Sequence, residues 1–156
     1  CQRLALEKAK FVARKNPGAL IIGADQIGIC NQHILAKTGN KERAVAQILS
    51  MSGKLCHFFT AIAVAKNNGA SGFETEIMID TTKVQLRKLN EQEIQNYVEL
   101  DNPISCAGSF KVESLGIVLF EKIETNDPSA LIGLPLIGVT TLLKIFNIRL
   151  LENALT

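Results

Sequence analysis

The sequence feature that most limits the fold is a short apolar run that stops at an acid and an amide. Residues 20–24 read Leu-Ile-Ile-Gly-Ala, and Asp25 and Gln26 follow directly. A run of this kind is typical of a central strand covered on both faces. Ligands of open α/β sheets bind beyond the carboxyl ends of the strands. We therefore expect the strand to end at Asp25 and Gln26, with both side chains at the mouth of a cleft. A plain turn cap at Asp25 is the competing interpretation.

The length and composition fit one globular domain. The chain has 156 residues, of which 47% are hydrophobic and 21% are charged, and no linker or internal repeat divides it. We expect a single domain over residues 1–156. The formal net charge is only +2 and the basic residues are scattered, which argues against nucleic-acid binding. No run is long and apolar enough to suggest a membrane span.

The cysteines indicate the compartment. The four cysteines show no C-x-x-C spacing, and the two histidines do not complete a zinc pattern. We expect free thiols and therefore a reducing compartment, the cytoplasm.

Apolar periodicity and capping signals predict alternating helices and strands. The expected helices cover residues 3–15, 40–52, 90–100 and 135–146, and the expected strands cover residues 20–24, 55–66, 73–86 and 116–124. A short extended segment with a turn around Asn31-Gln32 is expected over residues 27–35. Asn67-Asn68-Gly69 marks a turn between two of these strands, which predicts an antiparallel hairpin. Asn90 and Glu93 have the spacing of a capping box. The last helix is apolar on nearly every side, which predicts burial in the core or in a homodimer interface.

Lysines accompany the acid at residue 25. Lys8 lies in the first helix, Lys37 follows the first strand, and Lys111 lies in a small-residue loop over residues 105–114 that also holds Glu113. Cations balance phosphate charge, and a carboxylate can hold a divalent metal or activate a water. The pattern suits a polyphosphate substrate, although Lys8 could equally extend along the helix surface to solvent. The chain has no Walker A loop and no G-x-G-x-x-G motif.

These motifs resemble the Maf family of nucleoside triphosphate pyrophosphatases. The matching positions, in the family's order, are residues 7–9, 22–26, 37, 52–53 with 57 and 60, 106–113, and 133–136. They extend over almost the whole chain, and each motif is weak alone. The resemblance implies an α/β fold with a mixed twisted sheet and flanking helices around a central cleft, as in inosine triphosphate pyrophosphatases. Gln26 and the Gly-Ser-Phe-Lys-x-Glu loop are similar to the subgroup that acts on 7-methyl-GTP.

The resemblance also implies a reaction and residue roles. It implies hydrolysis of the bond between the α and β phosphates, which releases a nucleoside monophosphate and pyrophosphate, and we expect a house-cleaning activity on modified guanine nucleotides. Asp25 is then the general base or the carboxylate that binds a divalent metal, Mg²⁺ or Mn²⁺. The phosphate-binding residues would be Lys8, Lys37 and Lys111. Gln26 and Glu113 would select the base, with a solvated loop acid as the competing interpretation of Glu113.

The start of the chain departs from the family. The family begins with a strand and a Ser-x-Ser-x-x-Arg-Arg-like phosphate loop, and nothing upstream of Lys8 corresponds to them. We therefore expect the N-terminal strand to be missing and the activity of the chain as written to depend on that loop. A non-hydrolytic nucleotide-binding protein linked to septum formation is the alternative function. A dTTP or UTP pyrophosphatase is the other, and Gln26 and Glu113 argue against it.

Overall fold

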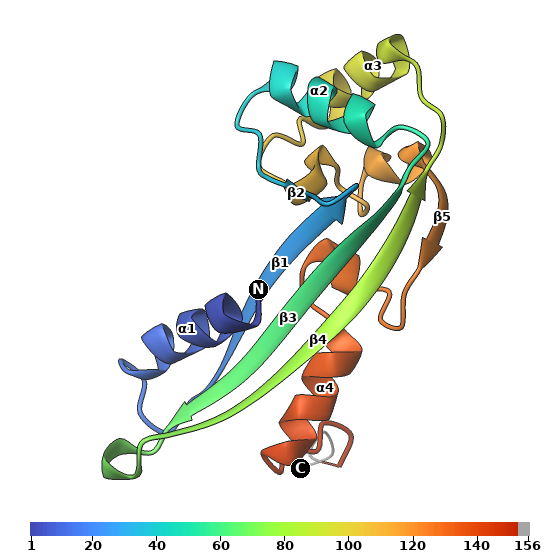
Figure 1. Ribbon diagram of the computed structural model, residues 1–156. Coiled ribbons are helices and arrows are strands. Elements are labelled where there is room, and N and C mark those ends of the chain that lie inside the picture. Colours follow the sequence, from blue (N-terminus) through green and yellow to red (C-terminus); the bar gives the residue numbers. More distant parts are fainter. Residues whose placement is uncertain (153–156) are drawn as a thin grey trace. The chain divides into compact units, whose positions relative to one another are not determined.

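The computed structural model describes residues 1–152, which form four α-helices and five β-strands (Figure 1). The helices are α1 (Gln2–Ala13), α2 (Lys41–Met51), α3 (Glu91–Asp101) and α4 (Leu136–Ile145). The strands are β1 (Leu20–Cys30), β2 (His33–Leu35), β3 (Leu55–Asn67), β4 (Phe73–Leu86) and β5 (Phe120–Glu124). Short 3₁₀ turns are η1 (Gly69–Ser71), η2 (Ala107–Ser109), η3 (Leu115–Leu119) and η4 (Ala130–Ile132).

The five strands form one antiparallel sheet. Their order is β2-β1-β3-β4-β5, so β3 and β4 are neighbours, as the predicted hairpin requires. At the two edges, β1 pairs with β2 and β4 pairs with β5, both antiparallel. The predicted α/β class, a sheet with flanking helices, is confirmed, and the sheet is antiparallel where a mixed one was expected. No helix within residues 1–152 combines the length and the apolar content that a membrane crossing requires.

The chain divides into two compact units. The first contains Cys1–Asp25, Thr60–Asp80 and the residues from Asp127 onward, and the second contains Gln26–Phe59 and Thr81–Asn126. Strands β1, β3 and β4 therefore contribute residues to both. The expectation of one domain over residues 1–156 stays a prediction, and its last four residues lie outside the described range.

Strand β3 is covered on both faces in the first unit. On one face, three fully buried alanines of α1 meet three fully buried alanines of β3: Ala5, Ala9, Ala13, Ala61, Ala63 and Ala65. On the other face, Ile62 and Val64 of β3 pack with Val139 and Leu142 of α4. The alternation follows from the two-residue period of a strand. The small side chains let α1 lie close to the sheet.

Gly23 is required by this close approach. A Cβ atom at Gly23 would lie 2.4 Å from the carbonyl oxygen of Ala5 and 2.7 Å from the backbone nitrogen of Ala9. Any larger residue would push α1 away from β1, because the obstructing atoms belong to the helix backbone. The glycine before Asp25 therefore fixes how near α1 lies to the acid.

Aromatic side chains form the centre of the second unit. Phe58 meets Phe110 edge to face with ring centroids 5.1 Å apart, and Phe110 meets Phe120 in the same way at 4.8 Å. Such pairs contribute about 0.5–1.5 kcal/mol beyond the area they bury. We call these three rings the aromatic ladder. Because β3, the small-residue loop and β5 each supply one ring, the aromatic ladder joins these three segments.

The local capping signals are confirmed. The side chain of Asn40 accepts a hydrogen bond from Arg43 N at 2.9 Å at the start of α2. Asn90 and Glu93 form a complete capping box at the start of α3. Both caps depend on residues three positions apart, which explains why the sequence reveals them.

Two expected boundaries were wrong. Strand β1 does not end at the polar pair but continues to Cys30, because Gly28, Ile29 and Cys30 pair with β2. Asp25 therefore lies within a strand. The expected strand over residues 116–124 begins only at Phe120, since the preceding residues form η3. There the Gly116 N–H donates to Lys111 O at 2.9 Å and closes a turn.

Candidate functional site

Lys8 and Asp25 form an ion pair in the first unit. The Lys8 ammonium donates to Asp25 Oδ1 at 2.6 Å and to Ala24 O at 3.1 Å. Ile21, Gly23 and Asp25 share the face of β1 that α1 covers, because strand side chains alternate. The Asp25 side chain is 17% exposed and the Lys8 side chain 55% exposed. The structure thus brings together two predicted site residues that are far apart in sequence.

The donor set at Asp25 fits one mode of metal binding. Mg²⁺ usually keeps several waters and binds through one or two carboxylates together with substrate phosphates. Asp25 suits that mode, because the Lys8 contact uses Oδ1 and leaves Oδ2 as an oxygen ligand. Across residues 1–152, no group of three or more His, Cys, Asp or Glu residues could hold a metal by itself. A fully protein-enclosed metal site is therefore not found in the described part of the chain.

In the second unit, Lys37 lies exposed on a loop that hydrogen bonds hold in place. The side-chain amide of Gln47 in α2 donates to Ala36 O at 3.1 Å and to Ser109 Oγ at 2.9 Å. The hydroxyl groups of Thr38 and Ser109 lie 3.3 Å apart. These contacts attach the Lys37 loop to the small-residue loop, which also carries Lys111 and Glu113.

The small-residue loop contains two residues in the left-handed region. Gly108 has φ +76° and Ser109 has φ +56°. A Cβ at Gly108 would lie 2.8 Å from both Phe58 Cζ and Phe110 Cε1, so the aromatic ladder requires glycine here. Ser109 is fully buried and is not a glycine, which makes its backbone strained. Strain of this kind is frequent at functional sites.

Lys111 and Glu113 have different surroundings. The Lys111 ammonium donates to Asp101 O at the end of α3, where a cation also complements the helix dipole. Lys111 O accepts hydrogen bonds from Ser114 N at 3.2 Å and Gly116 N at 2.9 Å. Residues 111–116 thus form a closed turn, and Glu113 is exposed on it.

Gln26 is half-buried in the second unit. It directly follows Asp25 within one continuous strand, so the two side chains point to opposite faces of that strand. This differs from the expected arrangement, in which both stood at the end of a strand. The proposed roles of Gln26, Lys37, Lys111 and Glu113 stay predictions.

The sequence analysis missed a buried carboxylate in the second unit. Asp101 is 8% exposed, and its two oxygens accept hydrogen bonds from Tyr97 OH at 2.9 Å and Ser114 Oγ at 2.6 Å. Tyr97 lies on the expected helix over residues 90–100 and Asp101 directly follows it, so their spacing of four was a usable signal. The contact between Ser114 and Asp101 gave no such signal, because it joins a helix to a loop.

Comparisons with known proteins show which family this chain resembles. The family model described as Maf-like protein matches residues 1–146. A protein of Idiomarina loihiensis named 7-methyl-GTP pyrophosphatase is 43% identical over 153 residues, which cover 97% of this chain and 76% of that protein. Proteins with the same name from Colwellia psychrerythraea and Hydrogenovibrio crunogenus are 43% and 46% identical. The alignments cover 97% and 95% of this chain, and 74% and 72% of those proteins.

Proposed function

This chain belongs to the Maf-like protein family, and on that premise we propose that it is a nucleotide pyrophosphatase acting on 7-methyl-GTP or a related modified nucleotide. The reaction adds water across the α–β phosphoanhydride and yields a nucleoside monophosphate and pyrophosphate. The names of the relatives support the substrate class. The observation that carries the proposal is the Lys8–Asp25 pair, which sets a carboxylate beside a cation at 2.6 Å.

Asp25 accepts the proton of the attacking water in this proposal. A positioned carboxylate suits general-base chemistry, which typically contributes about 10²–10⁴ in rate. Two of the three N–H donors of Lys8 are used by Ala24 O and Asp25, and the third is available to a phosphate oxygen. A divalent metal, Mg²⁺ or Mn²⁺, held by Asp25 and the substrate phosphates would supply charge neutralisation.

Lys37 and Lys111 are the further phosphate-binding residues that we propose. Lys37 is exposed, and its loop is held in place by Gln47, so little ordering is required on binding. Lys111 contacts Asp101 O in the structure. An ammonium group has three donors, so Lys111 can keep this bond while it contacts a phosphate.

Glu113 is the residue that we propose for base selection, with Gln26 as a contributor. A guanine edge presents two adjacent N–H donors, which one carboxylate can accept together. Methylation at N7 makes the base cationic, and the charge of Glu113 offsets this cation. A uracil or thymine edge lacks the paired donors, which is why we place dTTP and UTP second. No specific observation favours the alternative of a non-hydrolytic regulatory protein.

We also propose that α4 contributes to a homodimer. Leu136 and Ile137 at its start are 53% and 56% exposed, and Ile145 at its end is 53% exposed. Exposed apolar side chains gathered on one element are typical of interfaces. Light scattering at micromolar concentration should give the mass of two chains, and Ile137→Glu should lower it to that of one. The expected cytoplasmic location rests on the free thiols and stays a prediction.

The experiment that tests the function compares the chain with its Asp25→Asn variant. The wild-type chain is incubated with 7-methyl-GTP, GTP, UTP and dTTP in the presence of Mg²⁺ or Mn²⁺, and pyrophosphate release is measured. Asp25→Asn keeps the shape of the side chain and removes its charge, so we expect kcat to fall by at least about 10². Glu121→Gln, which changes an exposed acid on β5, is the control. Turnover by Asp25→Asn close to that of the control would exclude Asp25 from the mechanism.

A further inference from the structure

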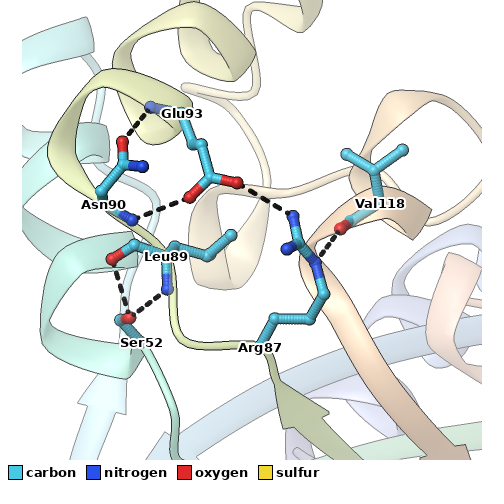
Figure 2. Close-up of polar contacts among 6 residues, drawn as sticks. All are labelled: Ser52, Arg87, Leu89, Asn90, Glu93 and Val118. Carbon is cyan, nitrogen blue, oxygen red and sulfur yellow. Dashed lines mark hydrogen bonds and ion pairs between the residues drawn. The ribbon is translucent and has the colours of Figure 1, made fainter.

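The segment that carries Glu113 is attached to both ends of α3. Figure 2 shows the attachment at the first end, where Asn90 and Glu93 form the capping box. Arg87 Nη2 contacts Glu93 Oε1 at 3.4 Å, and Arg87 Nε donates to Val118 O at 2.8 Å. The hydrogen bond from Asn90 N, with help from Arg87, lowers the pKa of the Glu93 carboxyl. Glu93 thus remains an anion that holds Arg87 against Val118, just after the Glu113 turn.

The second attachment involves the buried carboxylate at the other end of α3. The Tyr97 hydroxyl donates to Asp101 Oδ2 at 2.9 Å and accepts a hydrogen bond from Lys111 N at 3.1 Å. Ser114 Oγ donates to Asp101 Oδ1 at 2.6 Å. One carboxylate therefore anchors the turn on both sides of Glu113, through Tyr97 at residue 111 and directly at residue 114.

These partners are well suited to hold a fixed geometry. Burial raises the pKa of the Tyr97 hydroxyl well above its usual range, so the group stays protonated and continues to donate. A buried carboxylate is costly unless donors satisfy it, and here two hydroxyl groups do so. The Tyr97 ring is itself buried, which restricts the position of its hydroxyl.

The Glu113 side chain has no such support of its own. Within residues 1–152 its carboxylate makes no hydrogen bond or ion pair, and the residue is exposed. Its direction is therefore set by the backbone of the turn over residues 111–116. Whatever holds that backbone determines where the carboxylate is presented.

We propose that Tyr97 and Asp101 are positioning residues that hold the turn over residues 111–116, so that Glu113 presents its carboxylate to the edge of the nucleobase. The proposal rests on the proposed function, because it assigns Glu113 to base selection. It adds two residues that touch neither the base nor the phosphates. Their contribution is the orientation of Glu113, so their loss should weaken substrate binding more than turnover.

The test uses Tyr97→Phe, which removes one hydroxyl and keeps the buried ring. We expect faster hydrogen exchange of the backbone amides in residues 111–116 of the free protein. We also expect the KM for 7-methyl-GTP to rise about tenfold, with kcat changed by less than about twofold. Ser114→Ala, which removes the other anchor, should act in the same direction.

The matched control removes the hydroxyl group of Ser52, which binds the backbone of Leu89 just before α3. Ser52 Oγ accepts from Leu89 N at 2.8 Å and donates to Leu89 O at 3.2 Å (Figure 2), and neither hydrogen bond involves residues 111–116. Ser52→Ala should lower the thermal stability and leave the KM and the exchange of residues 111–116 unchanged. If Tyr97→Phe behaves as Ser52→Ala does, the proposal is wrong.

A double variant separates positioning from a merely structural role. In a Glu113→Ala background, Tyr97→Phe should not raise the KM further, because the group to be positioned is gone. A tenfold rise that persists in that background overturns the proposal, as does a loss confined to kcat. If the wild-type chain releases no pyrophosphate from 7-methyl-GTP, the proposed function fails instead. Hydrogen exchange then still decides whether Tyr97 holds the turn.

Discussion

Replacing Asp127 by asparagine should destabilise the start of α4 in a pH-dependent manner. Asp127 Oδ2 accepts hydrogen bonds from Ile137 N at 2.7 Å and Gly138 N at 3.2 Å, within the first turn of the helix. Oδ1 accepts from Ser129 N at 3.1 Å and Ser129 Oγ at 2.6 Å. The residue before the helix is Pro135, whose side chain makes no capping hydrogen bond. The carboxylate of Asp127, eight residues upstream, caps the helix instead.

The expected loss follows from these contacts. Asparagine keeps only one acceptor oxygen. Either the N–H group of Ser129 or the N–H groups of Ile137 and Gly138 therefore lose their acceptor. Leaving a poorly solvated N–H group without an acceptor costs about 1–3 kcal/mol. Loss of the charge at a helix N-terminus adds about 0.3–1 kcal/mol. We expect Asp127→Asn to lower the free energy of unfolding by about 2 kcal/mol at pH 7.

The stabilisation by Asp127 should be lost as the pH falls, because its carboxyl group must be ionised. Burial by itself raises the pKa of the Asp127 carboxyl, but the hydrogen bonds from Ser129, Gly138 and Ile137 lower it more, and the net pKa is below the usual value. The stabilisation is therefore complete above the unfolded-state pKa of about 3.9 and disappears as the pH falls through the lower folded-state pKa. The unfolding free energies of the wild-type chain and of Asp127→Asn should therefore converge at acidic pH.

Urea denaturation followed by circular dichroism at pH 7, 5 and 3 measures this difference. Glu76→Gln, an exposed acid on β4 in the same unit, is the control and should change the unfolding free energy by less than about 0.5 kcal/mol. An Asp127→Asn effect as small as that of the control would refute the capping role. A difference that stayed constant down to pH 3 would refute the assignment to the charge.

Two further predictions concern the second unit. Glu113→Gln should reduce kcat/KM for 7-methyl-GTP by about 10–150-fold, because a charge-assisted hydrogen bond contributes about 1.5–3 kcal/mol, and should affect UTP much less. Equal losses on both nucleotides would assign Glu113 to phosphate or structure. Gly108→Ala should destabilise the protein by about 1–3 kcal/mol in thermal or urea denaturation, through collision with Phe58 and Phe110. Gly18→Ala shares the positive φ but meets no atom within 4 Å, so equal losses in the two variants would leave backbone strain alone as the cause.

Local signals predicted most of the helices and the hairpin, and they indicated two residues of the candidate site. The caps at Asn40 and Asn90 were predictable because their partners lie three residues away. Asp25 and Lys8 were identified as site residues from their motifs. Their contact additionally requires glycine at position 23, which allows α1 to lie close to β1. The sequence supported a strand that ended at Asp25, because two polar residues interrupt the apolar run.

The misses have a common physical cause. The continuation of β1 depends on its pairing with β2, and the Tyr97–Asp101–Ser114 cluster depends on a helix meeting a distant loop. Periodicity and spacing report local preferences, whereas these features come from tertiary contacts. Buried polar clusters are therefore found from the structure, even when each member is an ordinary residue in the sequence.

The alanine contact between α1 and β3 has a consequence for conformational entropy. Alanine has no side-chain rotamers, so burying the six alanines freezes no side-chain torsion angles. The spacing between helix and strand is consequently fixed by backbone and methyl groups, which have no alternative packing to adopt on warming. Lys8 extends from this helix toward Asp25 on the neighbouring strand. The separation of their two backbones should therefore vary little with temperature, and the motion of the pair is confined to the lysine side chain itself.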